Sequence, residues 1–471
     1  MRASERCIYA FLLFQFVSQS LLMVESIGGL RMYLRAAAFL SSLGMLFLLR
    51  PMPGPRHPAR QVAIAFLVVL GLGILQPEAM LLAGFAHWWL NLAIWAPLFW
   101  VSRVVVTHRT LSNIFVLLWA FNLLSSVVGV LQVYFPERFA PSGEFVRNLL
   151  GPMADGLLIE LSDGRQVFRP FGLSDSPGGA ASAGSFAVLA GVLLLSKPRF
   201  YIRAIALLGI AIGTFCLYIC EVRSLMIFTA IGVIVFVVIQ FLQGRVTRVV
   251  AGLTLIPVIV ACVFAWSTTI GGQRVAKRIN TLSEASFGTV YYANRGRFLE
   301  HSLTEETLRY PVGAGLGRHG MMYSYFGDKR KLDARPLWAE IQLTAWLYDG
   351  GILLVCLGYF AILCTTFYSF KAALRRDRCQ HFSDAAAIIA ALNVSWLAIT
   401  FNYSLFVGQG GMLFWLLNAA LFAADHSSRM TSTMKKRKLP TERPDGTRHL
   451  RTASALPNLP VAEQSADPGS R

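Results

Sequence analysis

Residues 295–351 of the chain read RGRFLEHSLTEETLRYPVGAGLGRHGMMYSYFGDKRKLDARPLWAEIQLTAWLYDGG. This stretch places arginines, tyrosines, glycines and a glutamate between two long apolar runs, at about 249–267 and 343–370. Apolar runs of this length hold a protein in a membrane. A large charged loop between two of them indicates a functional segment exposed to water, and we interpret it as the water-facing half of an active site.

The composition is that of a polytopic membrane protein. Of the 471 residues, 55% are hydrophobic and only 14% are charged, whereas globular soluble domains are about 25% charged. The net charge is +18, and in a membrane protein such an excess is expected in cytoplasmic loops against anionic lipid rather than on a nucleic acid. The seven cysteines show no CxxC or Cys/His spacing, so neither a zinc site nor a disulfide framework is predicted.

Twelve apolar segments approach the length of about 20 residues that a helix needs to cross a bilayer. The predicted helices cover approximately residues 8–24, 32–49, 61–76, 79–101, 111–134, 181–196, 202–220, 224–242, 249–267, 343–370, 385–406 and 410–424. The first follows two arginines and is expected to be a retained helix rather than a cleaved signal peptide. The predicted fold class is therefore all-α, with about twelve transmembrane helices and large extracytoplasmic loops.

The charges of the short loops predict the orientation. With a cytoplasmic N-terminus, the inside loops are 50–60, 102–109, 197–203, 243–248 and 371–381. Each of these loops is basic, and the short outside links carry few positive charges, as the positive-inside rule requires. Both termini are then cytoplasmic, in a multi-pass membrane protein.

This orientation divides the chain into six regions. They are N-terminal helices (1–134), a first extracytoplasmic loop (135–180), central helices (181–267), a large extracytoplasmic loop (268–342), C-terminal helices (343–424) and a basic cytoplasmic tail (425–471). The large extracytoplasmic loop is net positive, on the side where positive charge is normally scarce, so we expect an anionic partner there. The tail contains little to bury and is predicted to be disordered.

Two arginines lie in the outer links of the central helices. Arg223 is in the tight link CEVRS, two residues after Glu221. A charge at the ends of two membrane helices is costly unless it is paired or faces a polar cavity. Arg223 either pairs with Glu221 or binds phosphate oxygens with its guanidinium fork. Arg169 begins RPFGLSDSPGG, whose glycines before a helix suit either an anion site or a plain re-entrant turn.

Within the large loop, Arg297 to about Arg309 is predicted to form an amphipathic helix, followed by a proline turn and the sequence GAGLGR. These glycines do not lie between a strand and a helix of a βαβ unit, so a dinucleotide site is not supported. We expect the loop to fold against the membrane domain with Arg318 at its mouth. His319 is equally compatible with a place on the surface.

One carboxylate stands at the outer end of the tenth predicted helix, Glu340 in PLWAEIQLTAWLYDGG. Close to several arginines, it is either a general base or the ion-pair partner of Arg335 or Arg318. We interpret Asp349, which precedes a glycine pair, as a turn or helix-packing residue.

The order of these motifs resembles the O-antigen ligase/polymerase superfamily of bacterial envelope proteins. The resemblance covers about residues 165–360 and rests on RPFGLSDSPG, on Arg223-Ser224, on Arg297 beside an aromatic residue, on YPVGAGLGR and on the DGG turn. It implies a type-C glycosyltransferase membrane fold. It also implies transfer of a glycan from undecaprenyl diphosphate to a sugar hydroxyl outside the inner membrane, with no metal or other cofactor.

Carried over to this chain, Arg223 matches the arginine of the short outer link, and Arg297 and Arg318 match basic loop positions. Members of the superfamily often have a His-Asn pair about eleven residues before the glycine that corresponds to Gly350. Here Ala339 and Glu340 stand in that place. The missing histidine counts against a ligase, and Glu340 is the group available as a base.

The sequence therefore predicts a polymerase that joins undecaprenyl-diphosphate-linked repeat units into exopolysaccharide or O antigen. The predicted catalytic residues are Arg223, Arg297 and Glu340, and the predicted substrate-binding residues are Arg169, Arg295, Arg318, Tyr323 and Trp338. Expected partners are the lipid-linked glycan, membrane lipid, a chain-length regulator and a flippase. The alternatives are an O-antigen ligase, a polysaccharide-precursor flippase or transporter, and a non-catalytic assembly partner; spans nearly free of central charge and the lack of repeats favour an enzyme over a transporter.

Overall fold

The computed structural model describes residues 3–50, 56–150, 154–160, 164–284, 287–328 and 337–438 of the chain. It divides into two compact units, Met1–Ser428 and Arg429–Arg471, and the helices discussed below pack within the first unit. The described residues are predominantly helical. This supports the predicted helical class, to which the structure adds one short antiparallel hairpin.

A helix forms at each of the twelve apolar segments. These helices are α1 (Ala3–Leu21), α2 (Arg31–Leu48), α3 (Arg60–Leu72), α4 (Leu81–Trp100), α5 (His108–Tyr134), α8 (Gly179–Leu195), α9 (Phe200–Ile219), α10 (Arg223–Leu242), α11 (Val246–Glu284), α16 (Gln342–Ala373), α17 (Gln380–Ile399) and α18 (Gln409–Lys438). Among the described residues, seven helices are long and apolar enough to cross a membrane. The chain is thus a membrane-associated helical protein by the length and composition of these helices.

Three helix C-termini differ most from the prediction. α11 continues to Glu284 and so reaches into the predicted large loop. α17 stops at Ile399 rather than at 406, because the following segment bonds to α16: the Gln342 amide donates to the Thr400 carbonyl at 3.0 Å, and the Gln342 side chain accepts from the Phe406 amide at 2.7 Å. α18 keeps residues 425–438 of the predicted disordered tail helical, and residues 439–471 lie outside the described residues.

The core of the first unit is built from apolar helices that are covered on most sides. Fourteen of the seventeen residues of α8 are buried, as expected for a helix that is hydrophobic all round. Gly184 of α8 and Gly213 of α9 allow these two backbones to approach closely, since a Cβ on Gly184 would lie 2.7 Å from the Gly213 carbonyl oxygen. Elsewhere, Trp95 of α4 stacks on Trp415 of α18 with ring centroids 4.1 Å apart.

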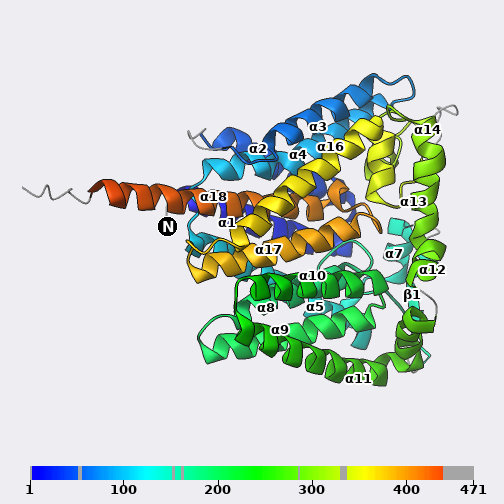
Figure 1. Cartoon of the computed structure of the whole chain (residues 1–471). Helices are drawn as coiled ribbons and strands as arrows, with labels where there is room; N and C mark the ends of the chain where they lie inside the picture. Colours follow the sequence, from blue (N-terminus) through cyan, green and yellow to red (C-terminus); the bar gives the residue numbers. More distant parts are fainter. Residues whose placement is uncertain are drawn as a thin grey trace, which may run out of the picture. The chain divides into compact units, whose positions relative to one another are not determined.

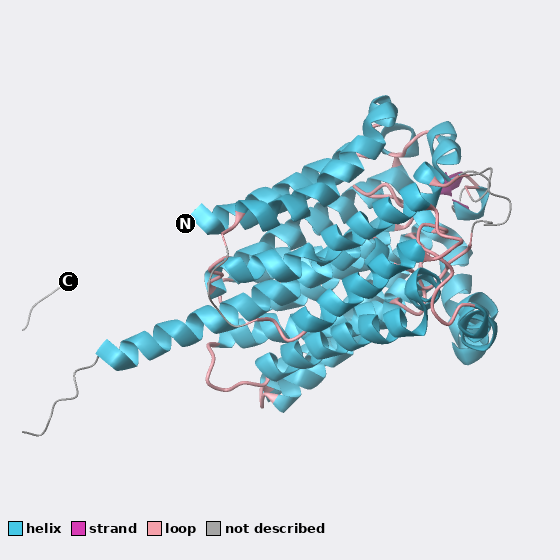
Figure 2. Cartoon of the chain, turned by 90° about the horizontal axis from the view of Figure 1, so that it is seen from above, coloured by secondary structure: helices cyan, strands magenta, loops and turns pink. Residues whose placement is uncertain are grey.

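The polar segments gather at one end of the helices (Figures 1 and 2). The first contains α6 (Pro136–Phe139), α7 (Gly143–Leu150) and the antiparallel strands β1 (Leu158–Glu160) and β2 (Gln166–Phe168). The second contains α12 (Phe287–Tyr291), η6 (Tyr292–Gly296), α13 (Arg297–His301), η7 (Ser302–Glu306), α14 (Thr307–Arg309) and α15 (Gly320–Phe326). The predicted helix from Arg297 to Arg309 is confirmed, because α13, η7 and α14 follow one another without a break.

The glycine-rich loop between α14 and α15 inserts among three helix ends. α16 is broken at Gly350 and Gly351, where the backbone leaves helical geometry. The loop pairs with this break: the Ala314 amide donates to the Tyr348 carbonyl at 2.7 Å, and the Ile352 amide donates to the Pro311 carbonyl at 3.0 Å. The loop therefore satisfies backbone groups that a continuous helix would have satisfied by itself.

The same loop also joins the connection between α3 and α4. The Leu316 amide donates to the Gly73 carbonyl, and the Leu316 carbonyl accepts from the Met80 amide, both at 3.1 Å. Leu316 itself is fully buried. The expectation that this loop folds against the membrane domain is confirmed.

Replacing Gly351 by alanine is predicted to destabilise the protein strongly. Its φ of +69° disfavours any side chain, and an added Cβ would overlap the Pro311 carbonyl oxygen. Gly244 has a similar φ of +76° with open space around it, so Gly244→Ala reports the conformational cost alone. We expect about 1–2 kcal/mol for that cost and about 1–3 kcal/mol more for the overlap in Gly351→Ala, measured by thermal unfolding in detergent. Equal losses from the two substitutions would contradict the insertion of the loop.

Candidate functional site

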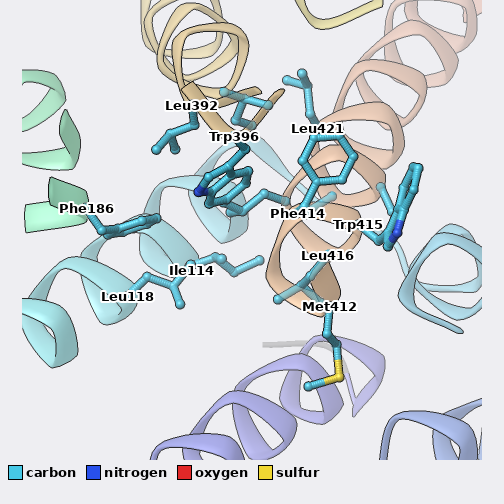
Figure 3. Packing of buried hydrophobic residues seen from close by; sticks show 14 of the residues in the cluster. Ile114, Leu118, Phe186, Leu392, Trp396, Met412, Phe414, Trp415, Leu416 and Leu421 are labelled. Atoms are coloured by element: carbon cyan, nitrogen blue, oxygen red, sulfur yellow. The ribbon is translucent and has the colours of Figure 1, made fainter. Parts of the chain in front are cut away.

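A cavity of about 440 Å³ lies between helices of the first unit. Its apolar wall includes Phe11, Phe16, Phe39, Leu118, Phe186, Leu189, Trp396, Met412 and Leu416. Several of these side chains, contributed by α5, α8, α17 and α18, face one another in Figure 3. The polar lining is concentrated in the loop Ser174–Ser176, the first turns of α8 and the segment that follows α17. The cavity is therefore apolar over most of its wall and polar where these loops contribute.

Arg35 of α2 and Asp175 are the two charged side chains in the lining formed by the described residues. They form an ion pair and are both largely buried, with 17% and 19% of their side chains exposed. The Nε atom of Arg35 donates to Asp175 at 2.7 Å, and its Nη1 atom donates to the Tyr325 hydroxyl at 2.6 Å. A guanidinium is thus held at the cavity by groups from two polar segments.

A second arginine lies one helical turn before this pair. Arg31 is only 9% exposed, and the described part of the chain offers no hydrogen-bond partner to its Nε or Nη2 atoms. Its guanidinium lies over the Phe145 ring at 4.4 Å. Residues four apart on a helix share a face, so Arg31 and Arg35 present two positive charges on the same side of α2. Sequence reasoning missed both, because it placed Arg31 in a short outside link with few charges (25–31) and Arg35 within the apolar run 32–49.

The loop after β2 is shaped by side chains of α5. Gln132 Oε1 accepts from the amides of Phe171 and Gly172, at 2.9 and 2.8 Å, and Ser125 Oγ accepts from the amide of Leu173 at 3.0 Å. These bonds turn the chain so that Asp175 and its neighbours reach the cavity. This glycine-rich entry is therefore a turn that also lines the cavity, and an anion site there stays a prediction.

Arg169 and Arg223 are brought to the same region of the polar end. Gly178 lies against Val222, since a Cβ on Gly178 would meet Val222 Cγ2 at 3.4 Å. Arg223 begins α10, and two residues later Leu225 lines the cavity. Arg169 and Glu221 both act electrostatically on Cys220. The CEVRS link and the loop that starts at Arg169 are therefore neighbours beside the cavity.

The conformation of this link is unusual. Glu221 has a φ of +53°. Among the described residues it is the only non-glycine residue with a positive φ. Left-handed backbone costs a residue with a side chain about 1–2 kcal/mol. Proteins tolerate this cost where the surrounding structure imposes the conformation. Here the left-handed conformation of Glu221 allows α10 to begin at Arg223, shortly after α9 ends at Ile219.

Glu340 is engaged in an ion pair. Its carboxylate pairs with Arg295, and its Oε1 atom accepts from Trp338 Nε1 at 2.7 Å. The alternative of a salt-bridge partner is thus supported, although the partner is Arg295 rather than Arg318; Arg335 lies outside the described residues. Neither Arg295 nor Glu340 is among the residues that line the cavity.

The other predicted residues of the large loop have separate places. Arg297 is exposed on α13. Arg318 is 3% exposed, pairs with Glu78 and donates to the Ala314 carbonyl at 2.9 Å. Tyr323 packs beside Met80 at the start of α4. Arg318 is therefore buried and paired with an exposed carboxylate, and it is not among the residues that line the cavity.

His319 and Asp349 belong to a buried cluster that sequence reasoning did not find. His87 of α4 and His319 each place Nε2 3.0 Å from a different oxygen of Asp349, and all three residues are at most 4% exposed. The surface position considered for His319 is wrong. Asp349 does lie at a helix break, but it also joins two histidines. An ionisable residue within an apolar helix, such as His87, was the available signal.

The Asp349 carboxylate also governs the protonation of His319. Burial by itself lowers the pKa of this imidazole, but the carboxylate and a hydrogen bond to the Ala345 backbone outweigh burial, so that the pKa of His319 is raised. The positive charge that burial disfavours is therefore supported by a specific anionic neighbour.

Comparisons with known proteins give no relative: no family model, no curated protein and no solved structure matches the chain. The structure thus presents two separate groups of functional interest. One is the cavity with Arg31, Arg35 and Asp175 at its polar part. The other is the buried cluster formed by His87, His319 and Asp349.

The Arg295–Glu340 pair is predicted to contribute a small, measurable coupling to stability. Its side chains are 32% and 20% exposed, and partly exposed pairs of this kind contribute about 0.2–1 kcal/mol. The substitutions Arg295→Gln, Glu340→Gln and both together form a double-mutant cycle, read by thermal unfolding in detergent. His301→Gln and Glu305→Gln provide the control cycle at a more exposed pair, for which we expect a smaller coupling. Strictly additive losses for Arg295 and Glu340 would show that the pair does not act as a unit.

Proposed function

We propose that the protein is a membrane glycosyltransferase that polymerises undecaprenyl-diphosphate-linked oligosaccharide units into exopolysaccharide or O antigen. The observation that carries the proposal is the cavity, whose wall is apolar except where Arg35, Asp175 and neutral polar groups line it. A lipid-linked donor has the same division between an apolar chain and an anionic headgroup. The sequence motifs that resemble the O-antigen ligase/polymerase superfamily support the same proposal.

The proposed topology has twelve transmembrane helices with both termini in the cytoplasm. The two polar segments then lie at the outer face of the inner membrane, where the glycan is assembled. This arrangement places the diphosphate beside α2 and the entry to α8, and the polyprenyl chain along the apolar wall. Arg31 supports it, because a guanidinium that is 9% exposed is costly to bury unless an anion accompanies it.

In the proposed reaction, a sugar hydroxyl of the acceptor attacks the anomeric carbon of the donor. The bond from that carbon to the diphosphate oxygen breaks, and the diphosphate leaves with additional negative charge. Arg31 and Arg35 stabilise this charge, with Arg223 and Arg169 nearby, by electrostatic complementarity in a site largely shielded from water. The hydroxyl proton passes to a carboxylate, and Asp175 is the carboxylate that lines the cavity.

Substituting the arginines of α2 tests the anion site. We expect Arg35→Ala and Arg31→Ala each to lower the rate of polymer formation by about 10²-fold, the loss typical of removing one preorganised donor. Arg297→Ala removes an exposed arginine of the same polar end and serves as the matched control, with a smaller expected effect. The measurement is chain formation by purified protein from a lipid-linked donor at equal protein levels. Wild-type rates from both α2 variants would eliminate this site.

The two carboxylates can be separated by a second comparison. Asp175→Asn removes the cavity carboxylate, and we expect a loss of about 10²-fold or more in rate, within the range of general-base catalysis. Glu340→Gln is expected to retain most activity, because Glu340 is not among the residues that line the cavity. The opposite result, with Glu340→Gln inactive and Asp175→Asn active, would return the role of base to Glu340.

A further inference from the structure

The buried cluster of His87, His319 and Asp349 has the composition and convergence of a metal site. We propose that these three residues bind one divalent transition-metal ion, of which Zn²⁺ is the best probe. Two imidazoles and one carboxylate are ligands of ions such as Zn²⁺ and Fe²⁺, whereas Mg²⁺ and Ca²⁺ prefer oxygen ligands alone. The proposal concerns a site apart from the cavity and does not depend on the proposed glycosyl transfer.

The ligand atoms come from three segments and meet in a small volume. His87 lies on α4, His319 ends the glycine-rich loop, and Asp349 lies at the break of α16. One possible ligand atom of each residue lies within 4.8 Å of the others. Both histidines turn Nε2 toward the carboxylate, each at 3.0 Å from one oxygen. A small rearrangement of these side chains brings the three atoms around one ion.

The environment of His319 and Asp349 also favours a bound ion. The ring of His319 also hydrogen-bonds the Ala345 backbone, the arrangement by which proteins orient a metal-bound imidazole. Asp349 is 1% exposed, and a buried carboxylate needs positive charge nearby. Arg318, the neighbour of His319 in sequence, already pairs with Glu78. Metal ligation requires neutral imidazoles, and the bound cation then supplies this positive charge.

The position of the site indicates a structural role. None of the three residues is among those that line the cavity, so the ion would not contact a substrate there. It would cross-link α4, α16 and the glycine-rich loop, which are already joined by main-chain hydrogen bonds. Metal binding to a folded site contributes its binding free energy to stability, so loss of the ion is expected to loosen this loop.

The test begins with the unaltered full-length protein. It is purified in detergent with an affinity tag that contains no histidine and without chelator, and its metal content is measured by elemental mass spectrometry. We expect about one transition-metal ion per chain, as for a single three-ligand site. Removal with a strong chelator should lower the thermal unfolding temperature, and added Zn²⁺ should restore it.

Variants then assign the site. Asp349→Asn keeps the size of the side chain and removes its charge, and we expect it, like His87→Ala, to lose the metal and the Zn²⁺-dependent stabilisation. His57→Ala is the matched control, because His57 is also buried, at 3% exposure, but belongs to no such cluster among the described residues. A wild-type protein without metal whose unfolding temperature does not respond to Zn²⁺ would overturn the proposal. Undiminished metal in Asp349→Asn would overturn it equally, and both measurements are independent of polymerase activity.

Discussion

The break in α16 at Gly350 and Gly351 is the constraint on which the polar end of the molecule depends. Irregular backbone among apolar helices persists only where protein groups satisfy its amides and carbonyls. Here the loop that begins at Pro311 supplies them through Ala314 and the Pro311 carbonyl. If the loop moved away, the Tyr348 carbonyl and the Ile352 amide at the break would lose these hydrogen bonds. The polar stretch is therefore an integral part of the helical unit rather than a cover over it.

Buried charges in the described unit are mostly matched by opposite charges from distant segments. Arg245 pairs with Asp384, and Arg378 pairs with Asp425. Breaking such a pair leaves one uncompensated buried charge, at a cost of about 3–5 kcal/mol. Arg31 differs from these arginines, because it forms no ion pair with a described carboxylate and both its Nε and Nη2 atoms are without a described hydrogen-bond partner. Since it stands one turn from the cavity-lining Arg35, this exception lies beside the proposed anion site.

Much of the helical arrangement was predictable because each helix is encoded locally. A helix forms at each of the twelve apolar runs, although only seven described helices are long and apolar enough to cross a membrane, and the helix from Arg297 to Arg309 followed from its amphipathic pattern. The end of α17 at Ile399 was not predicted, because the hydrogen bonds that hold the following segment come from Gln342, which is distant in the sequence. Local patterns specify a helix but not the side chains that meet it from elsewhere in the chain.

The candidate site was less predictable for the same reason. Glu78 and Arg318 are 240 residues apart, and His87 and Asp349 are 262 residues apart. Apolar periodicity carries no information on which distant helices pack together. Glu340 is a further example. The sequence showed that arginines lie near it, but which arginine pairs with it depends on how the segment around Arg295 is placed against the start of α16.

The cavity and the buried cluster are connected through α15. This helix begins directly after His319, and Met321 and Tyr325 lie four residues apart on one of its faces. Both contact Arg35: Nη1 donates to the Tyr325 hydroxyl at 2.6 Å and approaches the Met321 sulfur at 3.4 Å. The position of α15 is therefore fixed at its start by the cluster and along its face by the guanidinium. Because Arg35 also bonds Asp175, any displacement of the glycine-rich loop would be transmitted to the charged pair at the cavity.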